Sequence, residues 1–472
     1  MIDRAAASAL RERLTNLTDA LVVGYGVTGR AVALALKRRG VSVTVIDDRP
    51  ERVEAQAEAD GFGVSSPGEA GLSSLLRATQ IVLPSPGVPQ HHPAFTLADH
   101  LEVPVVSELD LAAVWDDRRI AAVTGTNGKT TVTTLVTAML GRSGIRALAT
   151  GNTEIPLVEA IDDDPEVEVF VVEASSFRLE RALLFRPNVA VWLNLAPDHL
   201  DWHGNLASYA AAKERVWASQ EATDVAVVPS DDPMVAEYGA VAPGRIVTFA
   251  APGTVADVAV VGASIVAYGH RLLDVADMRR RRPHDIANGC AAAAVALEMG
   301  ATLEAVADEL REFSGLPHRL QFVREVASER AVVSFYNDSK ATAPHATVVA
   351  LRGFDRAVLI AGGRNKDLDL SSLAEIVERL TAVIVIGEAA DEIAEVFVGR
   401  VLVEHASSMS EAVAMAWALA ESAGADVVLS PACASYDWYQ NYGARGDDFA
   451  AIVANLGRQT ASEKHSPSGE TR

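Results

Sequence analysis

The stretch 123–131, VTGTNGKTT, constrains the fold of this chain most strongly. The apolar run 120–123 predicts a short buried strand, and the apolar spacing of 132–140 predicts a packed helix. A glycine-rich turn between them would present backbone N–H groups to an anion, aided by the helix dipole. The pattern predicts a phosphate-binding loop, in which Lys129 reaches the β- and γ-phosphates and the Thr130 hydroxyl binds Mg²⁺. Val123 replaces the first glycine of the common motif, and a glycine-rich turn with an exposed lysine is the alternative.

Composition sets broad limits on the function. The chain has 472 residues, of which 49% are hydrophobic, so two or three domains with sizeable cores are expected. Its 63 Asp and Glu residues outnumber 41 Lys and Arg residues, and the net charge of −22 argues against nucleic acid and anionic membranes as partners. The distant cysteines Cys290 and Cys433 predict buried thiols in a reducing compartment. The sequence shows no signal peptide and no apolar run of membrane-spanning length, which predicts a soluble cytoplasmic protein without membrane insertion.

A second glycine-rich turn, GYGVTG at 24–29, follows the predicted strand 20–23. It opens a predicted helix that runs to about Arg39, and the next strand, 41–46, ends at Asp47, Asp48 and Arg49. A GxGxxG turn in such a β-α-β unit is typical of dinucleotide binding. Alone the motif is a weak signal, and binding of another nucleotide, or of none, is the alternative. A further strand, 81–83, leads into the turn 84–87, at a sheet edge where ligands tend to bind.

Two strands predicted after the phosphate loop, 167–172 and 189–194, lead into residues suited to bind metal. The strand 167–172 ends at Glu173, and a carboxylate beside a phosphate loop is well placed for Mg²⁺. In the segment PDHLDWHG, His199 and His203 have the spacing of a zinc pair, but no HExxH motif is present. The helix predicted over 208–219 carries Lys213 among alanines, and its local sequence predicts an ordinary surface lysine.

The remaining chain repeats the alternation of strands and helices. The run from 225 to about 275 is expected to form irregular β structure, and strands are predicted at 332–336, 357–361, 383–386 and 427–430. Polar or glycine-rich loops follow these strands, so ligand chemistry should gather along that sheet edge. We therefore predict an α/β protein of three domains: an N-terminal Rossmann-like domain (1–107), a central phosphate-loop ATPase-like domain (108–315) and a C-terminal Rossmann-like domain (316–459). The small, polar tail 460–472 is predicted to be disordered.

Several motifs, taken together, resemble those of the Mur ligases, the ATP-dependent amino-acid ligases of peptidoglycan precursor synthesis. The resemblance covers nearly the whole chain and lies in TGTNGKTT, EASSFRLE, DHLDWHG, GLPHR, NDSKAT and SPACASYDWYQNYGARGDDF. The segments DSKAT, GGRNKD and SPACAS are most similar to the family member that adds D-glutamate, and the DNPR-type signature of the diamino-acid-adding member is absent. Folylpolyglutamate ligases share the phosphate loop but not the N-terminal GxGxxG domain. A Mur-type ligase for a different amino acid is the alternative.

The resemblance implies a reaction and its cofactors. ATP would phosphorylate the carboxylate of UDP-N-acetylmuramoyl-L-alanine, and the amine of D-glutamate would attack the acyl phosphate and displace phosphate. Such chemistry needs charge neutralisation and positioning more than a protein nucleophile. The family further implies Mg²⁺ at two sites, a monomer, and a carbamate formed from CO₂ on Lys213.

The resemblance also assigns roles to residues of this chain. Those implied in catalysis are Lys129, Glu173, His199 and Lys213, and the implied metal ligands are Thr130, Glu173, His199 and Lys213. The ATP site would comprise Gly125, Thr126, Asn127, Gly128, Lys129, Thr130, Thr131, Asn288, Arg319 and Asp338. The UDP-linked substrate would contact Val27, Thr28, Asp47, Arg49, Ser85, Gly87, Asn152 and Ser175. D-Glutamate would lie among Lys340, Thr342, Lys366, Ser435 and Tyr442. Two positions depart from the usual family pattern, because Asp285 replaces an asparagine and Tyr442 replaces a phenylalanine.

Two other classes of enzyme share single features with this chain. A nicotinamide dehydrogenase would account for the N-terminal GxGxxG turn, but it leaves Lys129 and the third domain without a use. A phosphate-loop kinase would account for the centre of the chain and leave both ends without a function.

Overall fold

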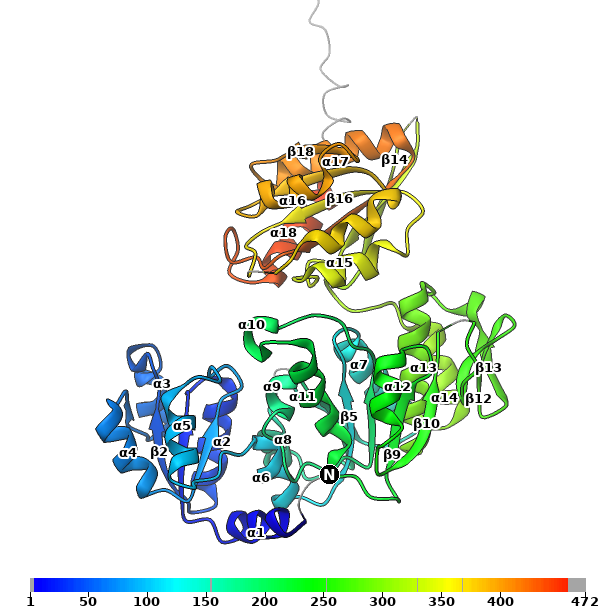
Figure 1. Ribbon diagram of the computed structural model, residues 1–472. Coiled ribbons are helices and arrows are strands. Elements are labelled where there is room, and N and C mark those ends of the chain that lie inside the picture. Colours follow the sequence, from blue (N-terminus) through cyan, green and yellow to red (C-terminus); the bar gives the residue numbers. More distant parts are fainter. Residues whose placement is uncertain (1–3, 153–154, 252, 329, 367, 457–472) are drawn as a thin grey trace, which may run out of the picture. The chain divides into compact units, whose positions relative to one another are not determined.

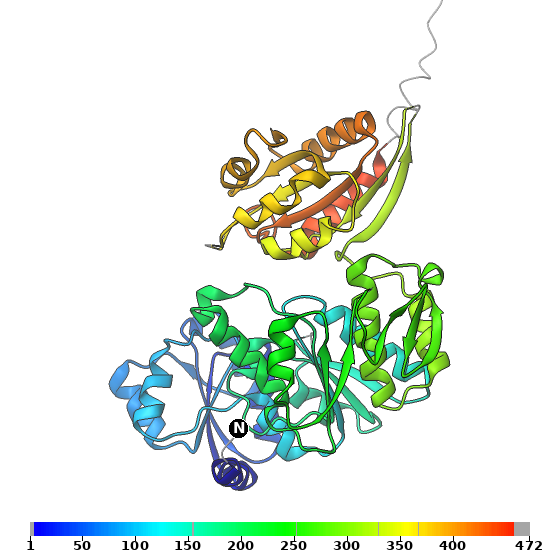
Figure 2. The same cartoon turned by 45° about the vertical axis from the view of Figure 1, so that its right-hand side comes forward.

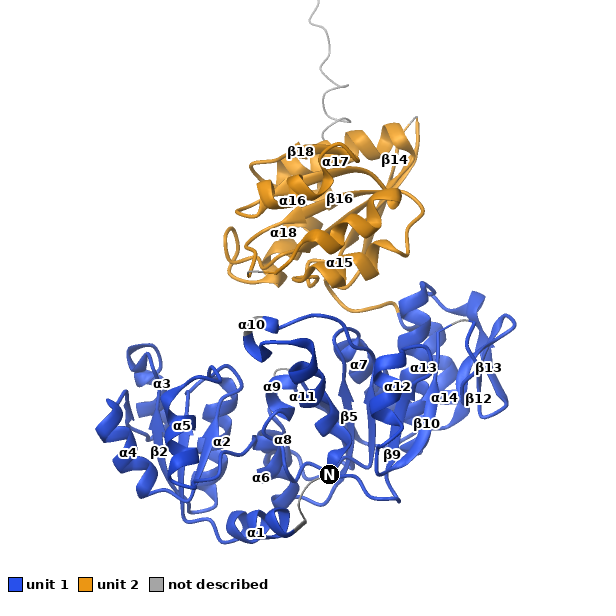
Figure 3. Cartoon of the chain, in the orientation of Figure 1, with its two compact units in different colours: residues 1–313 blue, residues 314–472 orange. Residues whose placement is uncertain are grey.

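A computed structural model describes residues 4–152, 155–251, 253–328, 330–366 and 368–456. The predicted disordered tail, 460–472, lies outside the described residues. The chain divides into two compact units, residues 1–313 and 314–472 (Figure 3). Each of the three predicted α/β regions contains one sheet, and the strands of the first two sheets belong to unit 1. Figures 1 and 2 show these sheets in blue, in cyan to green and in yellow to red.

The first sheet is parallel, with the strand order β3-β2-β1-β4. Because β1 lies between β2 and β4, the connections on its two sides diverge, which opens a crevice at the carboxyl ends of the strands. Its strands are β1 (Asp19–Val23), β2 (Ser42–Ile46), β3 (Val64–Ser65) and β4 (Ile81–Pro84). Its helices are α1 (Arg4–Thr15), α2 (Val27–Arg38), the short η1 (Pro50–Arg52), α3 (Glu54–Asp60), α4 (Glu69–Arg77) and α5 (Pro93–His100).

The second sheet has nine strands in the order β13-β12-β11-β10-β9-β8-β5-β7-β6. The central strands are parallel, whereas β11, β12 and β13 form an antiparallel meander at one edge. The β structure expected after residue 225 is confirmed, but its strands are regular and paired rather than irregular, and α12 (Pro233–Gly239) lies among them. The strands are β5 (Arg119–Thr124), β6 (Ala147–Gly151), β7 (Val169–Glu173), β8 (Val189–Trp192), β9 (Val225–Pro229), β10 (Arg245–Phe249), β11 (Val258–Val261), β12 (Ser264–Ala267) and β13 (His270–Asp274).

Helices cover the second sheet. On one side, α7 packs against the alanine-rich α13, and the small side chains of 291–294 are fully buried there. Alanine allows two backbones to approach closely, so this pair holds the start of α7 firmly. The helices of this region are α6 (Glu108–Trp115), α7 (Lys129–Arg142), α8 (Leu157–Asp163), α9 (Ser176–Leu179), α10 (Leu200–His203), α11 (Leu206–Ala218), α12 (Pro233–Gly239), η2 (Val275–Asp277), α13 (Pro283–Glu298) and α14 (Leu303–Glu312).

The third sheet, in unit 2, has the order β14-β15-β19-β16-β17-β18 and is parallel except for β14. Hydrophobic clusters fill both of its faces, so β16 is buried along its whole length, as expected for a parallel strand covered on both sides. The strands are β14 (Gln321–Ala327), β15 (Val332–Asn337), β16 (Ala357–Gly362), β17 (Leu380–Ile386), β18 (Leu402–His405) and β19 (Asp426–Ala432). The helices are α15 (Pro344–Leu351), η3 (Ser371–Arg379), α16 (Ala390–Phe397), α17 (Met409–Ala423) and α18 (Tyr442–Asn455).

A buried ion pair between two helices of the second region is also hydrogen-bonded to a helix of the first. Arg178, in α9, pairs with Glu108 at the start of α6, and their side chains are only 6% and 3% exposed. The Arg178 Nη2 donates a second hydrogen bond to Thr28 Oγ1, in α2, at 2.9 Å. A buried charge is tolerated when it is paired and hydrogen-bonded, so this arginine fixes the GxGxxG turn against the central sheet.

Replacing Arg178 with methionine should destabilise unit 1 by about 3–5 kcal/mol, because Glu108 would remain buried without its partner. Urea unfolding followed by tryptophan fluorescence measures this loss, since Trp192 and Trp217 are buried in unit 1. The double variant Arg178→Met/Glu108→Leu should regain much of it, because no unpaired charge is then buried. A single variant as stable as the wild type would show that the pair does not hold the two regions together.

Candidate active site

The predicted phosphate loop is a turn between β5 and α7. β5 ends at Thr124 and α7 begins at Lys129, as the sequence pattern predicted. Gly125 and Gly128 have φ angles of 152° and 86°, which side-chain-bearing residues rarely adopt. A Cβ on Gly128 would also lie 2.4 Å from Asn288 Oδ1, so Asn288, predicted to contact adenine, lies against the loop.

Asn194, which the sequence analysis did not assign to the site, anchors the loop to the end of β8. Its Oδ1 accepts hydrogen bonds from the backbone N–H of Thr126 and Asn127, at 3.1 and 2.9 Å, and its Nδ2 donates to the Asn127 carbonyl. The Thr126 hydroxyl exchanges hydrogen bonds with Ala196. The only sequence signal was the place of Asn194 at the end of a predicted strand.

Two lysines donate to one carbonyl oxygen of the loop. Lys129 Nζ lies 2.8 Å from the Gly125 carbonyl oxygen and 2.9 Å from that of Thr126, and Lys213 Nζ reaches the same Gly125 oxygen at 2.8 Å. Lys213, in α11, is only 1% exposed, so the surface position predicted from its local sequence is wrong. Burial, and then the nearby Lys129 charge, hold the pKa of Lys213 well below its ordinary value. The ring of Tyr209 lies 4.4 Å from Lys213 Nζ.

Glu173 ends β7 at the same sheet edge as the phosphate loop. It pairs in register with Val123 of β5, two residues before Gly125, and is 3% exposed. Its Oε1 accepts a hydrogen bond from Asn152 Nδ2 at 3.0 Å. Ser175, which follows in the chain, is buried, and no hydrogen bond to its Oγ is found within the described residues. A buried hydroxyl in this state is a candidate to bind a ligand.

His199 and His203 have different surroundings. His199 has a φ of 53°, and its ring packs edge-on against Phe177 at 4.8 Å. Its ring also lies 6.3 Å from that of Tyr209, which contacts Lys213. His203 is buried, with its Nε2 3.0 Å from Ser176 Oγ. Within the described residues no group of three or more His, Cys, Asp or Glu side chains is placed to hold a metal ion.

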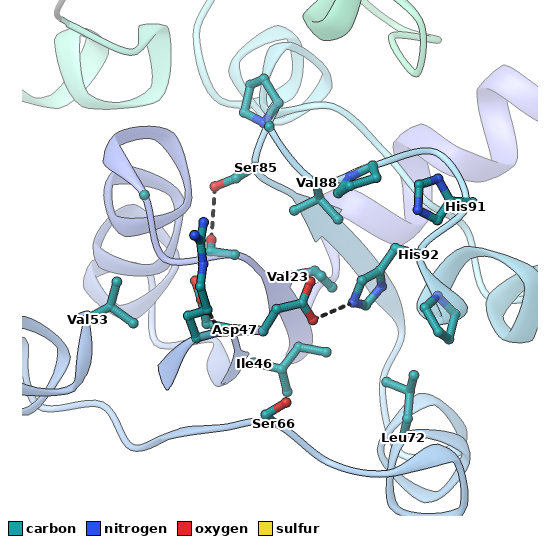
Figure 4. Close-up of a pocket in the computed structure, with 18 of the residues that line it drawn as sticks. Val23, Ile46, Asp47, Val53, Ser66, Leu72, Ser85, Val88, His91 and His92 are labelled. Atoms are coloured by element: carbon teal, nitrogen blue, oxygen red, sulfur yellow. Dashed lines mark hydrogen bonds and ion pairs between the residues drawn. The ribbon is translucent and has the colours of Figure 1, made fainter. Parts of the chain in front are cut away.

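A cavity of about 1330 Å³ opens at the carboxyl ends of β1, β2 and β4. It exceeds the roughly 300–1,000 Å³ usual for small-molecule pockets. Figure 4 shows Val23, Asp47, Ser85 and His92 around it. Of the eight residues assigned to the UDP-linked substrate, all except Ser175 line this cavity: Val27, Thr28, Asp47, Arg49, Ser85, Gly87 and Asn152. Arg178, which the sequence analysis did not single out, also lines it.

The turn beside this cavity is tightly packed. Ser85 Oγ donates to the Gly24 carbonyl at 2.9 Å and accepts from the Gly29 N–H at 3.0 Å (Figure 4 draws the first bond). The Asp47 carboxylate accepts hydrogen bonds from the backbone N–H groups of Tyr25 and Arg49, so it shapes the loops after β1 and β2. A Cβ on Gly29 would lie 1.9 Å from the Gly24 carbonyl oxygen, which is a steric clash. Only glycine, which has no Cβ, fits at this position.

In unit 2, the residues assigned to D-glutamate follow the ends of β15, β16 and β19. Lys340 Nζ lies 3.9 Å above the ring of Tyr442, so the tyrosine that departs from the family pattern presents its ring face to that lysine. Ser435 is buried and Lys366 is exposed. Thr342 lies in the same loop as Lys340, and its N–H donates to the Lys340 carbonyl.

Arg319 and Asp338, assigned to the ATP site, also belong to unit 2. The two Asp338 oxygens accept hydrogen bonds from the Leu320 N–H and from Ser430 Oγ. Arg319 is partly buried in the preceding loop. Of the residues assigned to the ATP site, Asn288 therefore lies beside the phosphate loop in unit 1, whereas Arg319 and Asp338 lie in unit 2.

Asp285, the second residue that departs from the family pattern, forms hydrogen bonds at the start of α13. Its Oδ1 accepts a hydrogen bond from Arg280 Nε at 2.9 Å, and its Oδ2 accepts from the Arg282 N–H. A carboxylate in the first turn of a helix is favoured by the helix dipole. Asp285 thus fixes the start of the helix that carries Asn288.

Gly29→Ala should destabilise unit 1 by about 1–3 kcal/mol, because the new methyl group overlaps the Gly24 carbonyl. Gly26→Ala is the matched control, since a Cβ there meets nothing within 4 Å, and it should change stability by less than about 0.5 kcal/mol. Urea unfolding of both full-length variants, followed by tryptophan fluorescence, compares them. Equal stabilities would contradict the close approach of Gly29 to Gly24.

No helix among the described residues is long and apolar enough to cross a membrane. Three family models match the chain in succession: the MurD-like N-terminal domain of Mur ligases at residues 18–107, the Mur ligase middle domain at 123–296 and the glutamate ligase domain of Mur ligases at 318–433. Together with the three sheets, these matches confirm the predicted organisation into three α/β domains.

Solved structures share the fold at low sequence identity. A pseudomurein peptide ligase type C from Methanothermus fervidus matches with a TM-score of 0.59 at 16% identity, over 93% of this chain and 100% of that one. MurF ligase from Thermotoga maritima, solved with ADP, matches with a TM-score of 0.56 at 17% identity, over 96% and 97% of the two chains.

Curated relatives are closer in sequence. A protein of Desulfosudis oleivorans named UDP-N-acetylmuramoylalanine–D-glutamate ligase is 39% identical over 94% of this chain and 97% of its own length. A protein of the same name from Frankia casuarinae is 41% identical, over 92% of this chain and 93% of its own length. With full-length relatives at these identities and three family models matched in order, this chain belongs to the Mur ligase family.

Proposed function

We propose that this protein joins D-glutamate to UDP-N-acetylmuramoyl-L-alanine in peptidoglycan precursor synthesis, with hydrolysis of ATP to ADP and phosphate. The observation that carries this proposal is a series of contacts that links the cavity to the phosphate loop. Asn152 lines the cavity and donates to Glu173, which ends the strand beside the one that leads into the loop. A substrate whose UDP portion lies in the cavity would extend its carboxylate along these contacts toward the ATP phosphates. Because ATP and a UDP-linked precursor are cytoplasmic metabolites, we propose the cytoplasm as the place of action.

The phosphate loop would bind ATP through its backbone and Lys129. The N–H groups at the start of α7 face an anion, and the helix dipole favours negative charge there. Lys129 Nζ now contacts the Gly125 and Thr126 carbonyls, so it would leave these neutral acceptors for a phosphate oxygen. A charge-assisted hydrogen bond to phosphate is roughly twice as strong as a neutral one. Asn288, against Gly128, would contact the adenine side of the nucleotide.

The residues at the sheet edge beside the phosphate loop suit Mg²⁺, which binds substrate phosphates as well as protein. They suit less well a metal that is held by protein ligands alone. Mg²⁺ keeps several waters and binds one or two carboxylates together with substrate phosphates. Glu173 supplies a buried carboxylate beside the loop, and the described residues contain no larger cluster of metal ligands. Glu173, Thr130 and His199 would hold the ions, which would neutralise charge on the phosphates. Two such ions are proposed, as in the family pattern.

Lys213 is proposed to carry a carbamate. Its amine nitrogen would bond to the carbon of CO₂ and release one proton, which leaves an anion with two oxygens that a hard cation prefers. The reaction needs a neutral amine, and burial together with the Lys129 charge favours that form of Lys213. A neutral or anionic group at this position also removes the repulsion that an ammonium would exert on Mg²⁺.

The amine of D-glutamate would attack the acyl phosphate, and phosphate would leave as the amide forms. In unit 2, Lys340, Thr342, Lys366 and Ser435 offer donors for two carboxylates, and Tyr442 flanks Lys340. Positioning of the amine and carboxylates, rather than a protein nucleophile, would supply most of the rate.

A phosphate-release assay with ATP, Mg²⁺, UDP-N-acetylmuramoyl-L-alanine and a panel of L- and D-amino acids tests the proposed function. D-Glutamate should be the best amine, and D-alanine should be rejected by roughly 10⁴-fold, because polar groups built for a side-chain carboxylate would lose their partner. Lys129→Ala should release almost no phosphate with any amine while it remains folded. Better use of L-lysine or diaminopimelate than of D-glutamate would reassign the protein within its family.

Carbon-13 NMR of the protein with labelled bicarbonate should show a carbamate signal that disappears in Lys213→Ala. Lys37→Ala, which removes an exposed lysine of the same unit, should keep both the signal and the activity. Lys213→Ala should lose most of its activity, because the proposed metal ligand is gone. A wild type without the signal would argue against the carbamate, whatever the activity of the variant.

A further inference from the structure

Arg445, in the first turn of α18, is a buried cation whose guanidinium is completely hydrogen-bonded. It is 1% exposed, and its Nε donates to Ser339 Oγ at 2.9 Å. Its Nη2 donates to the carbonyls of Ser339 and Cys433, and its Nη1 donates to those of Gly362 and Ala434. A guanidinium has five N–H groups, so these five hydrogen bonds use every donor.

The acceptors of Arg445 lie at the ends of three neighbouring strands. Ser339 follows β15, Gly362 ends β16, and Cys433 and Ala434 follow β19. These strands are adjacent in the sheet, in the order β15-β19-β16. One side chain therefore sets the spacing of three loops at the sheet edge where ligands bind.

Each of these loops carries a residue proposed to contact D-glutamate. Lys340 follows Ser339, Ser435 follows Ala434, and Lys366 lies in the loop that starts at Gly362. Ser339 Oγ, which accepts from Arg445, in turn donates to the Tyr442 carbonyl at 2.8 Å. The hydrogen bonds of Arg445 thus reach the residues next to Lys340 and Ser435, the start of the loop that carries Lys366 and, through Ser339, the Tyr442 carbonyl.

No carboxylate accepts a hydrogen bond from Arg445 within the described residues, because all of its acceptors are carbonyls or a hydroxyl. Burial lowers the pKa of Arg445 to about 10, so it remains a cation near neutral pH. The Asp437 carboxylate acts on the guanidinium only through its charge, which opposes burial and raises the pKa of Arg445. A buried cation that donates to no carboxylate is stabilised further when a ligand brings negative charge close to it. Two carboxylates of an amino-acid substrate would do so.

A glycine at position 363 leaves space beside the guanidinium of Arg445. Gly363 has a φ of 128°, and a Cβ there would lie 2.1 Å from the Ala434 carbonyl oxygen and 3.0 Å from Arg445 Nη1. Lysine keeps the charge but has three donors at one point, so it cannot span the same three loops. The planar shape of the guanidinium, as well as its charge, is therefore needed to hold the three loops.

We propose that Arg445 is a positioning residue for the amino-acid substrate, which holds three loops at the spacing that two carboxylates require and adds positive charge beneath them. This inference rests on the proposed function. A role in stability alone would lower the melting temperature without a selective effect on one substrate. A positioning role instead predicts a change in the KM for the amino acid.

The test measures phosphate release by full-length Arg445→Lys and Arg445→Met with each substrate varied in turn. The KM for D-glutamate should rise by about tenfold in Arg445→Lys and more in Arg445→Met, because misplaced loops lose their hydrogen bonds to the carboxylates. The KM for the UDP-linked substrate, whose proposed cavity is in unit 1, should change by less than about twofold. Arg324→Lys is the matched control, since Arg324 Nη1 donates to the Ala454 carbonyl on the same helix, and its KM values should equal those of the wild type.

Ser339→Ala keeps the inference testable if Arg445→Met does not fold. It removes only the hydroxyl between Arg445 and Tyr442, and it should raise the KM for D-glutamate by about threefold. Folded Arg445→Lys and Ser339→Ala with wild-type KM for D-glutamate would overturn the inference, as would equal changes in all three KM values. A wild type that does not use D-glutamate would overturn the proposed function as well, which separates the two failures.

Discussion

The shared contact of Lys129 and Lys213 with the Gly125 carbonyl is the interaction on which the central site depends. Two ammonium groups that donate to the same oxygen repel one another, and like charges repel more strongly inside a protein than in water. That repulsion adds to burial in favouring a neutral Lys213, and both lysines sit where a chain of net charge −22 meets an anionic nucleotide. The loop conformation, set by Gly125 and Gly128, brings the two amines together, so backbone geometry determines the electrostatics of the site.

The sequence predicted those parts of the site that depend on local structure. The phosphate loop and the GxGxxG turn each need glycines at fixed spacing between a strand and a helix, and that pattern is visible without tertiary contacts. The burial of Lys213 was not predictable, because its helix is rich in alanine on several faces and only the packed sheet shows which face is covered. Asn194 was missed for a related reason, since its partners Thr126 and Asn127 are distant in sequence. These residues act through contacts that periodicity does not reveal.

The antiparallel strands after residue 225 illustrate a second limit. Each of β11, β12 and β13 has only four or five residues, which is too short for a clear alternation of apolar and polar side chains. The adjacent strands of the sheet determine how β11, β12 and β13 pair. The sequence therefore indicated β structure but not the order of the strands. The family resemblance supplied the residues that we propose to bind ligands, but it did not supply Arg178 or Arg445, whose partners are defined by the fold.

These two buried arginines show how the same side chain can serve stability or a ligand. Arg178 faces the carboxylate of Glu108, so its charge is neutralised within the protein and it holds two regions of unit 1 together. Arg445 donates only to carbonyls and a hydroxyl, so no carboxylate of the described residues is hydrogen-bonded to it, and we propose that its charge also serves an anionic substrate. Removing one partner of the Arg178–Glu108 pair leaves the other charge buried and unpaired, which lowers the free energy of unfolding. Removing Arg445 takes positive charge away from the loops where an amino-acid substrate would bind. We therefore expect the effect of its removal to appear first in substrate affinity.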